Sequence, residues 1–194
     1  MTVGAPERRF ARMRSDAVSD PPSYSALPDD GLCLSVFLLL QPPDHSDSIL
    51  VGKADPSADW MKLGGLDAAR LANLADRWML PACQLELFES PDSAAKRVAA
   101  EQLGAEELAL SGPRVFSESY ARSGANGRDP HWDLHFVYVG LWAEQAPAAK
   151  SPWKDLKFVG ISEVLGQDPQ VRQASLGRGH GDIIELAFGR PQRP

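Results

Sequence analysis

The sequence predicts an α/β protein of the α+β kind, in which helices cover a sheet. Three observations lead to this fold class. Residues 31–41 contain the run Leu-Cys-Leu-Ser-Val-Phe-Leu-Leu-Leu, apolar on both alternating faces, which is typical of a strand covered on both sides. Residues 90–104 carry start and stop signals of a helix. Residues 131–139 alternate polar and large apolar side chains, as a strand with two different faces does.

Composition is that of one globular domain. The chain has 194 residues, of which 43% are hydrophobic and 24% charged, enough for an adequate core. A net charge of −6 argues against a generic nucleic-acid or membrane-surface binder but leaves small anionic ligands possible. Cys33 and Cys83 are too few for a disulfide framework. No apolar run approaches the ~20 residues that span a bilayer, and none near the N-terminus resembles a signal peptide. We therefore expect a soluble cytoplasmic protein.

The chain divides into a tail and a domain. Residues 1–30 show little apolar periodicity and combine arginines with acidic residues and prolines, so we expect a flexible tail or a strap over the domain or a partner subunit. A nucleic-acid-binding arm is the alternative for its basic cluster. Residues 31–194 form the predicted domain, with an insertion at about residues 54–77.

The elements that follow the first strand have less regular hydrophobic patterns. Residues 48–53 (Ser-Ile-Leu-Val-Gly-Lys) follow a Pro-Pro-Asp turn and are predicted to pair with residues 31–41 as a hairpin. Residues 60–65 are interpreted as a turn. Residues 67–76 place leucines at helical spacing, which predicts a short amphipathic helix inside the insertion.

The helix over residues 90–104 has a defined beginning and end. Ser90 is a good N-cap, Pro91 suits the first helical position, and Asp92 complements the positive end of the helix dipole. Gly104 can adopt the left-handed conformation that ends a helix. These signals alone require no catalysis.

The segment from Trp78 to Gly104 resembles the signature of the Nudix hydrolases. That signature is a glycine, five residues, a glutamate, seven residues, and then Arg-Glu-aliphatic-x-Glu-Glu-x-Gly-aliphatic. Over residues 83–105 this chain keeps a degenerate form of it, in which the matching residues are Glu89, Arg97, Glu101 and Gly104. Three positions differ: Cys83 replaces the first glycine, and Val98 and Gln102 replace two of the glutamates.

The resemblance implies a Nudix-like α/β/α sandwich with a mixed sheet. Enzymes of this family typically hydrolyse a nucleoside diphosphate linked to another group, and they use Mg²⁺ or Mn²⁺. Mg²⁺ is a hard cation that takes oxygen ligands, which the glutamates provide. By analogy, Glu101 is the remaining metal ligand and catalytic residue, and Gln102 is a weaker catalytic helper. Glu89, Arg97 and Gly104 are then structural residues of the signature loop and helix.

Two main functions follow from this degenerate signature. Val98 can neither bind a metal nor abstract a proton, and Gln102 keeps a carbonyl oxygen but no charge. Mg²⁺ can be held by one or two carboxylates together with substrate phosphates, yet losing a positioned base costs ~10²–10⁴ in rate. We therefore expect either a diverged, metal-dependent pyrophosphohydrolase or a catalytically silent nucleotide-binding or regulatory module. A dimer scaffold is a third possibility. The first two predict a small nucleotide-like ligand, and we expect a homodimer.

The strand over residues 131–139 is a source of further site residues. Its alternation places three polar side chains on one face, ~7 Å apart along the strand, so without a bulge they cannot all bind one ion. Two of them could share an ion or contact substrate; the alternative is a polar face that lines a cleft or an interface. These candidate substrate-binding residues are His131, Asp133 and His135, with Trp132, Leu134, Phe136 and Tyr138 on the other face.

The Gly-rich segment before this strand supplies the remaining candidates. Glu118 is a candidate metal ligand, to act with Glu101. Arg122 and Arg128 are candidate contacts for substrate phosphates. Cys83 is interpreted as a small buried residue rather than a nucleophile. Near the C-terminus, Asp182 is the expected N-cap of an apolar segment, and the less favoured alternative is His180 as a catalytic group.

Overall fold

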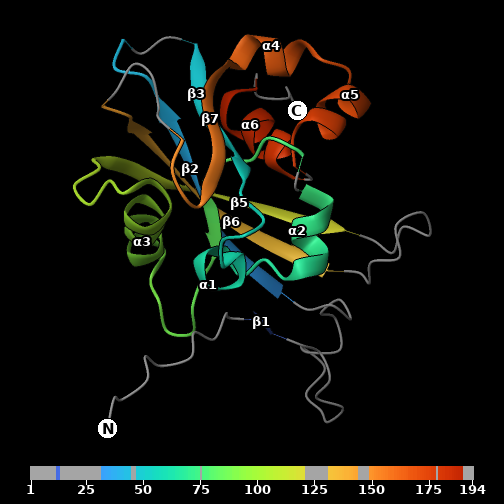
Figure 1. Ribbon diagram of the computed structural model, residues 1–194. Coiled ribbons are helices and arrows are strands. Elements are labelled where there is room, and N and C mark those ends of the chain that lie inside the picture. The colour runs from blue at the N-terminus through green and yellow to red at the C-terminus, as the bar shows by residue number, and fades with distance from the viewer. Residues whose placement is uncertain are drawn as a thin grey trace, which may run out of the picture.

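The protein is described here from a computed structural model, which covers residues 12–13, 32–44, 47–74, 76–120, 131–143, 149–177 and 179–189. A sheet lies at the centre, with helix α3 (Pro91–Leu103) against one face and the C-terminal helices α4 (Ile161–Gly166) and α6 (His180–Phe188) against the other (Figure 1). Apart from Arg12 and Met13, the predicted tail lies outside the described residues.

The main sheet is mixed. Strand β2 lies inside the sheet and pairs parallel with β6 and antiparallel with β1 and β4, while β5 pairs antiparallel with β6. This arrangement confirms the predicted fold class and the inner position of the first strand. The strands are β1 (Arg12–Met13), β2 (Leu32–Gln41), β4 (Ala82–Gln84), β5 (Leu110–Tyr120) and β6 (His131–Leu141).

A second, two-stranded sheet consists of β3 (Ser48–Ala54) and β7 (Trp153–Gly160) in antiparallel pairing. The predicted hairpin between β2 and β3 is therefore wrong. A segment from the middle of the chain lies between the two strands instead. The Pro81 carbonyl accepts a hydrogen bond from β2 at 2.9 Å, and Met79 exchanges two hydrogen bonds of 2.8 Å with β3.

Two short helices precede β4. Helix α2 (Ala68–Leu74) confirms the helix predicted inside the insertion. The turn predicted over residues 60–65 is a helix, α1 (Trp60–Gly64), because the Asp59 side chain caps its first turn and Gly65, with a φ of 74°, ends it. The Trp60 ring packs edge-on against that of Trp153, with 4.8 Å between ring centroids.

Helix α3 begins and ends where the sequence predicts. The Ser90 hydroxyl accepts a hydrogen bond from the backbone N–H of Ser93 at 3.1 Å, and Gly104 ends the helix with a φ of 66°. The small residues of α3 permit close packing on β2. Its buried side chains belong to one hydrophobic cluster, which includes Ala94, Ala95, Val98, Ala99 and Leu103 of the helix and Val36, Leu38 and Leu40 of the strand.

The other face of the sheet is covered by α4 (Ile161–Gly166) and α6 (His180–Phe188), with α5 (Pro169–Ser175) between them in the chain. Leu39 and Val137 of the sheet form a second cluster with Ile183 and Ile184 of α6. Gly179, not Asp182, stands at the N-cap of α6, and Asp182 lies in its first turn. Within the described ranges, no helix combines the length and the apolar character needed to cross a membrane.

Candidate functional site

Arg97 fixes the loop that leads into α3. Its Nε donates to Glu89 Oε1 at 2.8 Å, and its Nη2 donates to Glu89 Oε2 at 2.7 Å and to the Gln84 carbonyl at 3.1 Å. Glu89 Oε2 also accepts the backbone N–H of Glu86 at 2.9 Å. The structure thus brings together Glu89 and Arg97, the pair to which the resemblance assigns a structural role.

Cys83 lies behind this ion pair and is 4% exposed. Burial raises the pKa of its thiol to about 12, although the nearby Arg97 acts in the opposite direction. The thiol is therefore protonated at neutral pH, which makes Cys83 a small core residue rather than a nucleophile.

Gln102 has contacts that differ from those of a catalytic side chain. It is 1% exposed, and its Oε1 accepts the backbone N–H of Ala82 at 3.3 Å. Its Nε2 donates to the carbonyl oxygens of Ala82 at 2.7 Å and Leu63 at 3.2 Å. Because the amide is engaged inside the protein, these contacts are those of a structural residue, and a catalytic role for Gln102 stays a prediction.

The two predicted metal ligands lie on different sides of the sheet. Glu101 is half-buried on α3, which packs against one face. Glu118 on β5 shares a face with Phe116, and that face packs against α4 and α6. The two residues therefore lie on elements at different faces of the sheet, and a metal shared by Glu101 and Glu118 stays a prediction.

The described residues do not by themselves provide a complete set of ligands for Mg²⁺ or Mn²⁺. No group of three or more His, Cys, Asp or Glu side chains within them is arranged to hold an ion. Hard divalent cations need several oxygen ligands around one point. At two of the three helix positions where the signature places glutamates, Val98 is fully buried and the Gln102 amide is bonded to backbone, and only Glu101 keeps a carboxylate.

A polar cluster occupies the sheet face opposite α3. Asp133 and His135 of β6 lie on this face, and His135 Nε2 is 3.3 Å from Glu118 Oε2. His135 is 6% exposed, and its Nδ1 has no hydrogen-bond partner among the described residues. Its ring packs edge-on against Phe37, with 5.3 Å between centroids.

His180, at the start of α6, completes this cluster. Its ring packs edge-on on the same Phe37 with 5.4 Å between centroids, and its Nδ1 accepts the backbone N–H of Leu80 at 3.0 Å. Burial, and to a lesser degree the neighbouring His135, lowers the pKa of His180 to about 4. The imidazole is therefore neutral at pH 7, with Nδ1 as acceptor and Nε2 as donor.

The side chains of three predicted substrate-binding residues lie outside the described part of the structure. Arg122 and Arg128 lie outside the described residues. His131 begins β6 and is described by its backbone alone, which pairs with Tyr120.

A pocket of about 110 Å³ lies beside Gln102 and reaches the polar cluster. Ala82 and Gly64, which surround the Gln102 amide, form part of its wall. Its other lining residues include the aromatic rings of Phe37 and Trp60 and the polar side chains of Ser35, Gln84 and His180. This combination of apolar walls and a few polar groups is typical of a small-molecule site.

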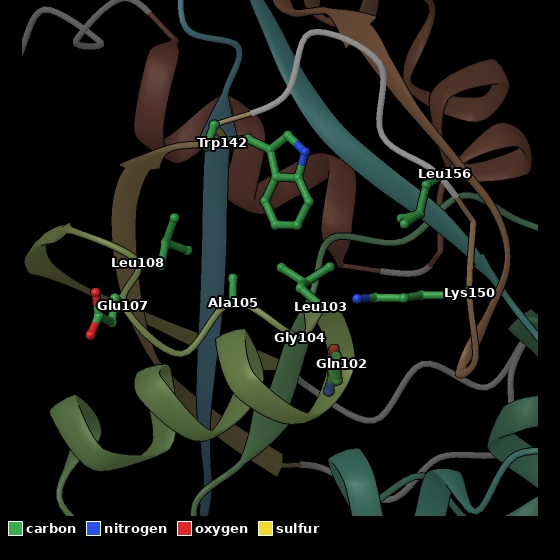
Figure 2. Close-up of a pocket in the computed structure, with 10 residues that line it drawn as sticks. Gln102, Leu103, Gly104, Ala105, Glu107, Leu108, Trp142, Lys150 and Leu156 are labelled. Carbon is green, nitrogen blue, oxygen red and sulfur yellow. The ribbon is translucent and has the colours of Figure 1, made fainter.

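A larger pocket, of about 290 Å³, lies at the C-terminal end of α3. Figure 2 shows Trp142, Leu103 and Leu156 around it, with the Lys150 amine directed towards Leu103 and Gly104. Of the predicted site residues, only Gln102 and Gly104 line it. We take the smaller pocket as the candidate site, because the polar groups converge there.

Comparison with solved structures places this fold among the Nudix hydrolases. The E. coli dihydroneopterin triphosphate pyrophosphohydrolase is 13% identical with a TM-score of 0.51, and covers 79% of this chain and 92% of its own. The MutT protein of Methanosarcina mazei is 13% identical with a TM-score of 0.52, over 80% and 91%. The Nudix hydrolase RenU of M. smegmatis is 17% identical with a TM-score of 0.51, over 83% and 89%.

These likenesses confirm the Nudix fold that the signature implied. No family model matches the sequence, and no curated protein sequence matches it.

Ser35 and Gln84 are candidate site residues that sequence reasoning missed, and His180 is one that it ranked below Asp182. Ser35 lies inside a run read only as a buried strand, and Gln84 falls at an unconstrained position of the signature. For His180 a signal existed, because a histidine between two glycines opens the last apolar segment. Only the fold brings these side chains to one pocket.

Proposed function

We propose that this protein is a Nudix-fold module that binds a nucleotide-like ligand and does not hydrolyse it. One observation supports this proposal most. Two of the three helix positions where the signature has glutamates carry Val98 and Gln102, which are 0% and 1% exposed. The side chains at these positions therefore offer no carboxylate to the pocket, while the pocket itself keeps groups that can bind a ligand.

The chemistry of the pocket supports a flat heteroaromatic ring as the bound group. Phe37 offers an aromatic surface, and Ser35, Gln84 and His180 offer hydrogen-bonding groups. A volume of about 110 Å³ is small compared with the ~300–1,000 Å³ of pockets that enclose a whole ligand. We propose that the pocket receives the base and that the rest of the ligand extends over the polar sheet face.

The sheet face suits sugar better than phosphate. Glu118 and Asp133 carry carboxylates there, which accept hydrogen bonds from hydroxyl groups but repel phosphate. Arg122 and Arg128 remain the predicted phosphate contacts. The homodimer and the absence of nucleic-acid and membrane partners also stay predictions.

A diverged, metal-dependent pyrophosphohydrolase is the second candidate. It is supported by Glu101, a half-buried carboxylate one turn beyond Arg97 on the signature helix. On this hypothesis, Mg²⁺ or Mn²⁺ would be required for turnover, and Glu101 would be essential to it.

Ligand binding and product analysis separate the two candidates. Nucleoside diphosphate sugars and dinucleoside polyphosphates are added to the protein in EDTA and in Mg²⁺ or Mn²⁺, followed by thermal-shift measurement and chromatography of the nucleotides. We expect an equal rise in Tm under both conditions and intact ligand. Hydrolysis that needs the metal and disappears in Glu101→Gln would contradict the proposal and establish the second candidate.

Two matched substitutions locate the ligand. Gln84→Met removes a hydrogen-bonding amide from the smaller pocket, and we expect affinity to fall about tenfold. Lys150→Met removes the cationic group that lines the larger pocket among the described residues, and we expect no change. The reverse pattern would place the ligand at the end of α3 and contradict the assignment.

A further inference from the structure

Two backbone carbonyl oxygens converge on the side-chain nitrogen of Gln102. The Ala82 oxygen is 2.7 Å and the Leu63 oxygen 3.2 Å from Nε2, and the side chain is 1% exposed. The backbone is close-packed around this point. A Cβ added to Gly64 would lie 3.2 Å from the Ala82 oxygen and 3.7 Å from Nε2.

This point is rich in negative partial charge. Besides the two carbonyls, it lies at the C-terminal end of α3, where the helix dipole is negative. Carbonyl oxygens that face a buried side chain need a donor or a cation, because an unpaired polar group inside the protein costs free energy. Each of the two Nε2 hydrogens can serve one of the two oxygens, so the amide satisfies both.

A metal cation would meet the same need in the same geometry. Carbonyl oxygens are ordinary ligands of Mg²⁺ and Ca²⁺, at ~2.0–2.6 Å from the ion. We propose that the Gln102 amide stands in for a cation: it holds β4 and the end of α1 to α3, so that the folded site needs no metal. It follows that Gln102→Glu turns this point into a divalent-cation site.

The charge balance of the substitution supports this consequence. A glutamate at position 102 has the same length but brings two acceptor oxygens and no donor. Three or more oxygens would then face one another inside the protein without a hydrogen between them. Such a cluster is stable only if it takes up a proton or a cation. Glu101, the adjacent half-buried carboxylate, favours the cation.

This inference does not rest on the proposed ligand. It concerns what holds the end of α3 in place, and it can be measured on the protein without any nucleotide. A protein that binds no nucleotide could still show the predicted response to cations, and the reverse also holds.

Thermal unfolding of three full-length proteins tests the inference. Wild type, Gln102→Glu and Gln102→Met are compared in EDTA and in Mg²⁺, Mn²⁺ or Ca²⁺. Methionine has a similar size but neither charge nor N–H donors, so it controls for loss of the hydrogen bonds alone. Titration with Mn²⁺, followed by electron paramagnetic resonance, gives the number of bound ions.

We expect both variants to melt below wild type in EDTA. A divalent ion should raise the Tm of Gln102→Glu by at least about 4 °C, with one Mn²⁺ bound per chain. It should leave wild type and Gln102→Met unchanged. Adding Glu101→Gln to Gln102→Glu restores the wild-type charge and should weaken Mn²⁺ binding.

Three results would overturn the inference. The first is a Gln102→Glu protein that is stabilised by acid but not by divalent cations. The introduced carboxylate would then be neutralised by a proton and not by a metal ion. The second is Mn²⁺ binding by wild type as tight as that by the variant. The third is a Gln102→Glu protein that fails to fold with and without divalent ions, because rescue by the ion is the predicted behaviour.

Discussion

Phe88 lies on the turn before α3 and has a backbone conformation that few residues other than glycine adopt. Its φ is 66° and its side chain is 99% exposed, while Arg97 and Glu89 hold the turn in place. A left-handed conformation costs a residue with a Cβ roughly 1–2 kcal/mol, and an exposed ring gains no burial that offsets this cost.

We expect Phe88→Gly to stabilise the protein by up to about 1 kcal/mol, because glycine removes this strain. Chemical denaturation measures the change in the free energy of unfolding. The control is Leu87→Gly next to it, where the φ is not positive, and which should be destabilising. A loss of stability in Phe88→Gly equal to that in Leu87→Gly would show that the turn is not strained.

His180 makes stability depend on pH. Its pKa is about 4 in the folded protein against an ordinary value of 6.5, mainly because of burial. Between these values the unfolded chain binds more protons, so the contribution of the neutral ring is complete above pH 6.5 and is lost as the pH falls towards 4. The loss amounts to at most about 3 kcal/mol.

Denaturation at pH 7.5 and pH 5 measures this dependence. Asparagine places an oxygen near the position of Nδ1, so His180→Asn keeps an acceptor for the Leu80 N–H but cannot be protonated. We expect the wild type to lose more stability than His180→Asn between the two pH values. Equal losses would show that His180 is not the source of the pH dependence.

At the scale of elements, Gly52 allows the second sheet to pack against the core. A Cβ at this position would lie 2.3 Å from Cε3 of Trp153, a ring held between β3 and α1. We expect Gly52→Ala to destabilise the protein by about 1–3 kcal/mol through overpacking. Gly166, the last residue of α4, has no atom within 4 Å of an added Cβ. Gly166→Ala should therefore be neutral or stabilising, and thermal unfolding of both variants compares the two sites.

The sequence predicts local elements better than pairings. The boundaries of α3 follow from Ser90, Pro91 and Gly104, which act on their own neighbours. The hairpin prediction failed because β3 pairs with β7, about a hundred residues later, and because residues 79–81 enter between β2 and β3. No local pattern contains this information, since strand pairing depends on the whole topology.

At the scale of the whole molecule, the fold class and the two faces of β6 could be predicted, because alternation shows which residues share a face. The sequence does not show which helix covers which face of the sheet. The sequence predicts Glu101 and Glu118 as metal ligands without showing that α3 packs against one face of the sheet and that Glu118 lies on the other face. The same layer arrangement brings His180 to Phe37 and His135, a contact between residues far apart in the chain.

The segment from Met79 to Gln84 joins the main sheet, the second sheet and helix α3. It is hydrogen-bonded to β2 on one side and to β3 on the other, and its Ala82 backbone is joined to α3 through Gln102. It also forms part of the wall of the smaller pocket. A molecule that enters this pocket and moves these few residues would shift both sheets and the signature helix together, which gives the protein a mechanical route from occupancy to a change of shape.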